Sequence, residues 1–150
     1  MKKEETKIVD NLSVVVPVYN DQEVLQELYR RLNPVVESLA THYEIVLVDD
    51  GSKDHSWDEI MKLREADDHI VAVKLARNFG QQNSIAAGLN VAKGEIIVLM
   101  DSDLQDRPED IPVLIDTLLK SGTQMAIAQW QTRQDTWAKR TVSNIFNRVS

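Results

Sequence analysis

Four short apolar runs, each ending in a polar cluster, constrain the fold of this 150-residue chain more than any other feature. The segments between the runs carry apolar residues at helical spacing, so the runs are predicted to be parallel strands of a βαβ layout. Ligands of open α/β sheets bind beyond the carboxyl ends of the strands. The polar clusters are therefore expected to converge on one site. The runs are Leu12–Val16, Glu44–Val48, Ile70–Ala76 and Glu95–Met100.

The other segments complete an α/β arrangement with helices on both faces of a mostly parallel sheet. Residues 1–11 are charged and expected to be flexible, and residues 12–150 are short enough to form one domain. The chain stops inside an apparent helix, so we expect a fragment truncated at its C-terminus. Helices are expected over 24–39 with a kink or break at Pro34, from about Asp54, over Gln81–Ala92, after an Asp106 N-cap and from about Thr136, with a fifth strand at Gln124–Gln129.

Composition excludes several classes of protein. The formal net charge of −7 argues against a general nucleic-acid-binding protein, because such binding depends on Lys and Arg at the phosphates. Cysteine is absent, which excludes disulfides and thiolate metal sites. The first residues lack the long apolar segment of a signal peptide, so none is expected, and no run approaches the roughly 20 apolar residues that cross a bilayer. We expect the chain alone to be soluble and cytoplasmic.

The cluster after the fourth run is the best candidate for a metal site. Asp101 and Asp103 are two residues apart, so a strand end can direct both carboxylates to one cation, and Gln105 offers a further oxygen. Hard oxygen ligands of this kind select Mg²⁺ or Mn²⁺, which proteins usually share with substrate phosphates. The alternative is that Asp103 or Asp106 only caps the following helix.

The other clusters are suited to a nucleotide but are less specific. The Asp49–Ser52 cluster could accept hydrogen bonds from a base or ribose, or could be an ordinary Asp-rich turn. Tyr19 offers an aromatic wall for a base, with Asp21 beside it. Arg77 could contact a phosphate or hold a carboxylate of the site. A basic helix near the C-terminus could face anionic lipid headgroups, or could simply be solvated on one side.

Together the clusters resemble the family 2 glycosyltransferases of GT-A fold. The resemblance covers nearly the whole chain from residue 12, and four motifs in order at the right spacing make it specific. The longer strings 77–82 and 103–109 are similar to the polyprenyl-phosphate sugar transferases, which include dolichyl-phosphate mannose synthases, and residues 133–148 to the undecaprenyl-phosphate formamido-arabinose transferases. The matching strings are Pro17-Val18-Tyr19-Asn20, Val48-Asp49-Asp50-Gly51-Ser52, Arg77-Asn78-Phe79-Gly80 and Asp101-Ser102-Asp103-Leu104-Gln105-Asp106.

The resemblance implies a role for each matched residue. The nucleoside pocket would be lined by Pro17, Tyr19, Asp21, Val48 and Asp50, and Asp101 and Ser102 would lie against the nucleotide-sugar. The metal on the diphosphate would be held by Asp101, Asp103 and Gln105. The acceptor phosphate or the diphosphate would be faced by Arg133, Lys139 and Arg140. Trp130 stands where the family often has Arg, which puts one phosphate contact in doubt.

The implied reaction is transfer of a sugar, with inversion, from a nucleotide-diphosphate sugar, most simply UDP-linked, to a polyprenyl phosphate at the cytoplasmic face of the membrane. A phosphate acceptor is already anionic near pH 7, so no catalytic base is assigned. Two alternatives stay open: a truncated nucleotide-sugar-binding module without activity, and a transferase with a saccharide acceptor. Two other classes of α/β protein are excluded. A phospho-receiver would need an acidic pair after the first strand, where this chain has Pro17-Val18-Tyr19, and a dinucleotide dehydrogenase would need a Gly-x-Gly-x-x-Gly turn, which follows none of the runs.

Overall fold

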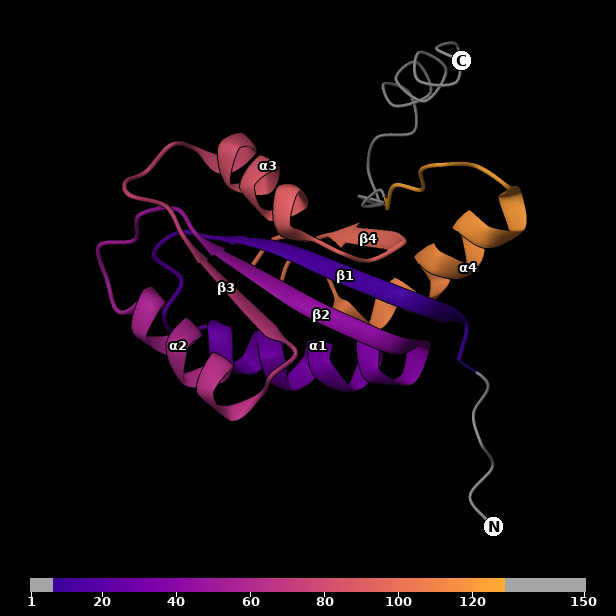
Figure 1. Ribbon diagram of the computed structural model, residues 1–150, viewed down its shortest axis with the longest axis horizontal. Helices are drawn as coiled ribbons and strands as arrows, with labels where there is room; N and C mark the ends of the chain where they lie inside the picture. The colour runs from indigo at the N-terminus through magenta and orange to yellow at the C-terminus, as the bar shows by residue number, and fades with distance from the viewer. Residues whose placement is uncertain (1–6, 129–150) are drawn as a thin grey trace, which may run out of the picture.

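The computed structural model describes residues 7–128 of the chain (Figure 1). Strands and helices alternate along this part of the chain, as the apolar runs predict. The strands are β1 (Val9–Val18), β2 (Ala40–Asp49), β3 (Ile70–Lys74) and β4 (Ile96–Leu99), and the helices are α1 (Leu25–Leu39), α2 (Ser56–Ala66), α3 (Gln81–Val91) and α4 (Ile111–Ser121), with a short 3₁₀ helix, η1 (Pro108–Asp110), before α4.

The four strands form one sheet in the order β3-β2-β1-β4, and all neighbouring pairs are parallel. The chain moves outward from β1 to β2 and β3, then crosses back to the other side of β1 as β4. The strand order therefore reverses between β1 and β4. Ligands of open α/β sheets bind at such a reversal, outside the carboxyl ends of the strands.

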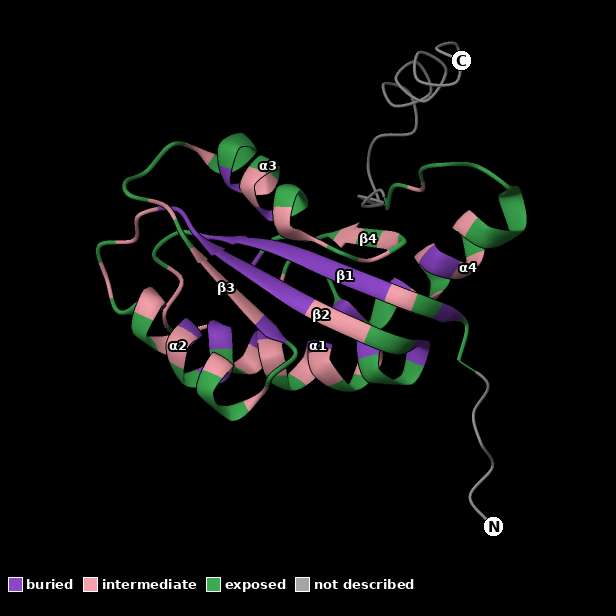
Figure 2. Cartoon of the chain, viewed as in Figure 1, coloured by how far each residue is buried: buried purple, intermediate pink, exposed green. Residues whose placement is uncertain are grey.

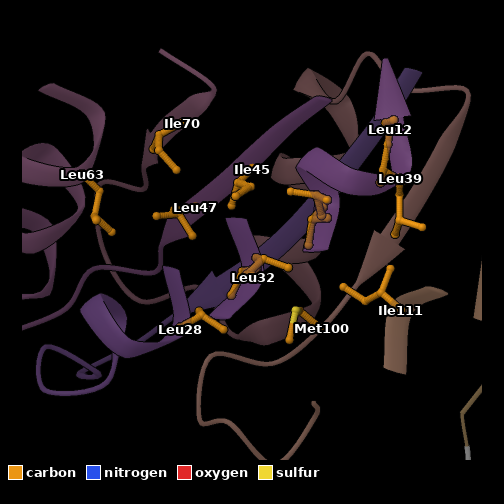
Figure 3. Close-up of a cluster of buried hydrophobic side chains, with 14 of the residues drawn as sticks. Leu12, Leu28, Leu32, Leu39, Ile45, Leu47, Leu63, Ile70, Met100 and Ile111 are labelled. Carbon is orange, nitrogen blue, oxygen red and sulfur yellow. The ribbon is translucent and has the colours of Figure 1, made fainter. Parts of the chain in front are cut away.

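Helices cover both faces of the sheet, which confirms the predicted fold class. Helices α1 and α2 lie on one face and α3 on the other (Figure 1). Side chains alternate along β2, so Leu47 joins the α1–α2 core while Val48 joins the α3 core. The longest runs of buried residues lie in β1 and β2 (Figure 2). The larger core gathers around Leu28 and Leu32 of α1, with Met100 and Ile111 beside them (Figure 3).

All four predicted strands are confirmed, with small differences at their ends. The first strand begins at Val9, so residues 9–11 belong to the sheet rather than to a flexible terminus. This extension arises because Val9 pairs with Ala40, the first residue of β2. Helix α1 is not split at Pro34, which lies inside it. The buried residues on either side, Leu32 and Val36, hold both halves of the helix to the same core.

The predicted fifth strand, Gln124–Gln129, is wrong over its described residues, because 124–128 form no strand and Gln129 lies outside the described chain. Residues 124–128 line an apolar hollow of about 660 Å³ together with β4 and α4. A strand needs a hydrogen-bonding neighbour about 4.8 Å away. Within residues 7–128, β4 is hydrogen-bonded to β1 alone, so the apolar segment shares a hollow with β4 but does not pair with it. None of the helices within residues 7–128 is long and apolar enough to cross a membrane.

Candidate functional site

Most of the predicted site residues meet where the strand order reverses. A hollow of about 380 Å³ lies at the carboxyl ends of β1 and β4 and beside the N-terminus of α3. This volume is within the usual range for ligand pockets. Ser102 Oγ donates a hydrogen bond to the Asp21 carboxylate, which joins the β1 and β4 loops across the reversal. The lining includes the predicted residues Pro17, Tyr19, Asp21, Asp50, Asp101, Ser102 and Asp103.

Reciprocal hydrogen bonds join the loop after β1 to the loop after β2. Asn20 N donates to Ser52 Oγ at 3.0 Å, and Lys53 N donates to Asn20 Oδ1 at 2.8 Å. Asp21 N donates to Ser56 Oγ at 2.9 Å. Asn20 has a φ of 54°, a left-handed conformation that Asn tolerates better than most residues. These contacts fix the wall of the hollow that the β1 loop provides.

Asp50 and Gly51 support the loop that leads into α3. The Asp50 carboxylate accepts hydrogen bonds from Phe79 N at 2.8 Å and from Gly80 N at 3.0 Å. Gly51 has a φ of +67°, and a Cβ there would lie 2.4 Å from the carbonyl carbon of Arg77. Only glycine fits so close to another backbone. The Asp-Gly pair therefore positions a second wall of the hollow.

Three of the predicted residues within 7–128 do not line the hollow. Val48 is fully buried in the α3 core, below the site. The Arg77 guanidinium lies 4.7 Å from the centroid of the Phe79 ring, a cation–π contact, so it is placed on this ring rather than in the hollow. Gln105 donates its backbone N–H to Asp103 Oδ1 at 3.0 Å, and its side chain is not part of the lining.

The surroundings of Asp101 disfavour the negative charge of its carboxylate. Burial raises the pKa of its carboxyl, and the carboxylates of Asp106, Asp103 and Asp21 add to this effect, while a hydrogen bond from Gln81 opposes it. Gln81 Nε2 donates to Asp101 Oδ1 at 2.6 Å. Asp106 accepts a hydrogen bond from Asp101 N at 3.1 Å. The predicted role of Asp106 as a helix N-cap is wrong, because the N-cap residue is Arg107 in η1 and Asp110 in α4.

The donor set is suited to a hard divalent cation that shares its ligands with a substrate. Asp101 and Asp103 both line the hollow, and the mutual repulsion of the carboxylates would be relieved by a cation. Over residues 7–128, no three Asp, Glu or His side chains are close enough together to hold a metal by themselves. A cation bound here would need further oxygens, such as those of a diphosphate.

Several residues that the structure brings to the hollow have no role predicted from the sequence. Asn78, Gly80, Gln81 and Ser84 line it from the α3 side. Within the string 77–82, the residue types predict a ligand contact for Arg77 alone, because Arg77 is the only charged residue of the string. The predicted acceptor residues Arg133, Lys139 and Arg140 lie outside the described residues, as does Trp130.

Fold and site together define an α/β protein with an acidic, nucleotide-sized hollow at the reversal of its strand order. The family model for glycosyl transferase family 2 matches residues 13–149, which is most of the chain. The chain therefore belongs to glycosyltransferase family 2.

Solved structures agree with this assignment. A fragment of TarS from S. aureus, 1–349, in complex with UDP is 29% identical, with a TM-score of 0.55 over 71% of this chain and 32% of that one. The mannosyltransferase PcManGT from Pyrobaculum calidifontis, in complex with GDP-Man and Mn²⁺, is 24% identical, with a TM-score of 0.54 over 68% and 31%. Glucosyl-3-phosphoglycerate synthase from Mycobacterium tuberculosis, with Mn²⁺, UDP and glucosyl-3-phosphoglycerate, is 23% identical, with a TM-score of 0.59 over 73% and 40%. The chain thus spans about a third of the length of these structures.

Proposed function

We propose that this chain carries the donor site of a transferase that moves a sugar from a nucleotide-diphosphate sugar to a polyprenyl phosphate with inversion. The observation that carries the proposal is the hydrogen bond between Ser102 and Asp21. It joins the loop that bears Tyr19 to the loop that bears Asp101 and Asp103, so that one hollow contains both an aromatic ring and the carboxylates. UDP is the favoured nucleotide, since the TarS structure that is 29% identical holds UDP. The polyprenyl-phosphate acceptor rests on the sequence resemblance of residues 77–82, 103–109 and 133–148.

Each wall of the hollow has a separate task in this proposal. Tyr19, which is 40% exposed, offers its ring to the base, and Asp21 lies beside it. Asp101 and Asp103 would hold Mg²⁺ or Mn²⁺ against the diphosphate, and Gln105, whose side chain does not line the hollow, would have to turn inward to become a further ligand. The cation would neutralise the charge that develops on the leaving nucleotide diphosphate. No residue acts as a base, because the acceptor phosphate is anionic near neutral pH.

The remaining parts of the proposal concern residues outside the hollow. Arg133, Lys139 and Arg140 would bind the acceptor phosphate at the cytoplasmic face of the membrane. Arg77 would reach a phosphate only after leaving the Phe79 ring, so we give it a secondary role.

Calorimetric titration tests the donor site directly. UDP and GDP are each titrated into the chain with and without Mn²⁺, and into the Asp103→Ala and Asp116→Ala variants. Asp116, on α4, is paired with Lys120 and provides the matched control. We expect UDP binding that Mn²⁺ strengthens, with the strengthening lost in Asp103→Ala and kept in Asp116→Ala. Binding of neither nucleotide would refute the donor site. Binding without sugar transfer to undecaprenyl phosphate would instead identify a nucleotide-sugar-binding module.

A further inference from the structure

Gln81 is the first residue of α3 and has no role among the proposed metal ligands and nucleoside contacts. Its side chain lines the hollow and donates from Nε2 to Asp101 Oδ1 at 2.6 Å. We infer that Gln81 is a positioning residue, which fixes one oxygen of the Asp101 carboxylate and leaves the other free for the cation. The inference rests on the proposed function, because it assigns Asp101 to the metal.

The backbone of Gln81 is held from the central part of the sheet. Asp50, at the end of β2, accepts hydrogen bonds from the N–H groups of Phe79 and Gly80, immediately before Gln81. Further along α3, Gly88 packs so closely on β1 that a Cβ there would lie 2.4 Å from Val15 Cγ1. The helix is therefore fixed at both its start and its middle, and a residue on such a frame can orient a neighbouring side chain.

Asp101 lies in a different element of the fold from Gln81, so the hydrogen bond between them joins two separate parts of the chain. The loop that carries Asp101 follows β4 and is folded by its own bond, from Asp101 N to Asp106 Oδ2 at 3.1 Å. No hydrogen bond within this loop holds the Asp101 carboxylate. The bond from Gln81 joins α3 to the β4 loop, so it sets the orientation of this carboxylate.

A neutral donor suits this position better than a charged one. Three other carboxylates act on Asp101, those of Asp106, Asp103 and Asp21. Lys or Arg in place of Gln81 would neutralise part of this charge and compete with a divalent cation. Glutamine orients the carboxylate while leaving its negative charge available to the metal. Groups that hydrogen-bond to metal ligands in this way typically change metal affinity by about 10- to 100-fold when they are removed.

The test measures Mn²⁺ affinity by electron paramagnetic resonance, for the whole 150-residue chain, with and without UDP. The variants are Gln81→Met, which keeps the length but removes the donor, and Gln81→Lys, which keeps a donor but adds charge. Gln82→Met is the matched control, because Gln82 is also exposed at the start of α3 and does not line the hollow. UDP affinity without metal and the melting temperature are measured for every variant.

We expect Gln81→Met to weaken Mn²⁺ binding roughly 10-fold, Gln81→Lys to weaken it further, and Gln82→Met to leave it unchanged. Metal-free UDP affinity should be the same in wild type and Gln81→Met. Wild-type Mn²⁺ affinity in Gln81→Met would overturn the positioning role while leaving the donor site intact. If Gln81→Met lost metal-free UDP affinity by the same factor as Mn²⁺ affinity, the positioning role would be overturned too, because the loss would show that Gln81 contacts the nucleotide directly. A wild-type chain that binds neither Mn²⁺ nor UDP would remove the donor site and, with it, the role of Gln81.

Discussion

Replacing Gly51 with alanine tests how the loop after β2 supports the donor hollow. The added Cβ would lie 2.4 Å from the Arg77 carbonyl carbon, 2.5 Å from Asn78 N and 2.8 Å from Arg77 Cα. All three are backbone atoms, which cannot rotate away as the end of a long side chain can. The loop that leads into α3 would have to move, although two bonds to Asp50 hold it at Phe79 and Gly80.

Two effects contribute to the expected loss of stability. The left-handed φ of +67° costs a non-glycine residue about 1–2 kcal/mol. Overpacking at a site without room typically costs a further 1–3 kcal/mol. The sum, about 2–5 kcal/mol, is a large part of the total stability of a small domain, about 5–15 kcal/mol. Gly122→Ala separates the two effects, because Gly122 has a φ of +64° and a Cβ there would meet no atom within 4 Å.

Urea unfolding followed by circular dichroism gives the free energy of unfolding of wild type and both variants. We expect Gly122→Ala to lose only the conformational part, about 1–2 kcal/mol, and Gly51→Ala to lose at least about 1 kcal/mol more. The wild type should have the highest denaturant midpoint, and the two variants should share its m-value. Equal destabilisation by the two substitutions would refute the reasoning, since it would show that the Arg77 loop moves without cost.

Three further predictions concern the core and the surface. Gly88→Ala adds a Cβ 2.4 Å from Val15 Cγ1, so it should lower the melting temperature despite the better helix propensity of Ala, and a rise would contradict this packing. Leu32→Ala should reduce the free energy of unfolding by about 2–5 kcal/mol in urea, because Leu32 is fully buried, and a loss below about 1 kcal/mol would contradict this burial. Arg31 lowers the pKa of Glu109 from 4.5 to about 2, so this pair stabilises the fold above pH 4.5 and loses its effect as the pH falls toward 2. Urea midpoints of wild type and Glu109→Gln should therefore differ modestly at pH 7 and converge near pH 2, while a constant difference would exclude this linkage.

The sheet and the place of the site could be predicted because both depend on local patterns. Apolar runs of strand length separated by helical spacing define a βαβ chain, and parallel strands bring their carboxyl ends to one edge. Asp21, Asp50 and Asp101 therefore meet as expected. The fifth strand was wrong because a strand depends on a neighbour. The pattern at 124–128 is apolar enough, but the segment pairs with no strand of the described chain.

The partners of individual side chains could not be predicted, since they depend on contacts between distant parts of the chain. Asp106 has the sequence context of a helix cap, yet it accepts a hydrogen bond from Asp101 N within the same loop. Arg77 has the charge of a phosphate ligand but is placed on the ring of Phe79. Gln81 carries no charge, so its residue type predicts no role, although its bond to Asp101 crosses between two elements of the fold.

The adjacent residues Asp49 and Asp50 show how one short motif can build two walls of a site. Asp49 is the last residue of β2 and Asp50 is the residue after it, and their carboxylates bind two different loops. Asp49 is fully buried and accepts a hydrogen bond from Ser52 N at 3.2 Å, which folds the loop that holds the β1 side of the hollow. Asp50 holds the loop before α3. Asp49 Oδ2 is buried without a partner among the described residues, an arrangement that costs about 1–3 kcal/mol. The fold therefore tolerates this cost at a residue whose other oxygen folds the loop that supports the hollow.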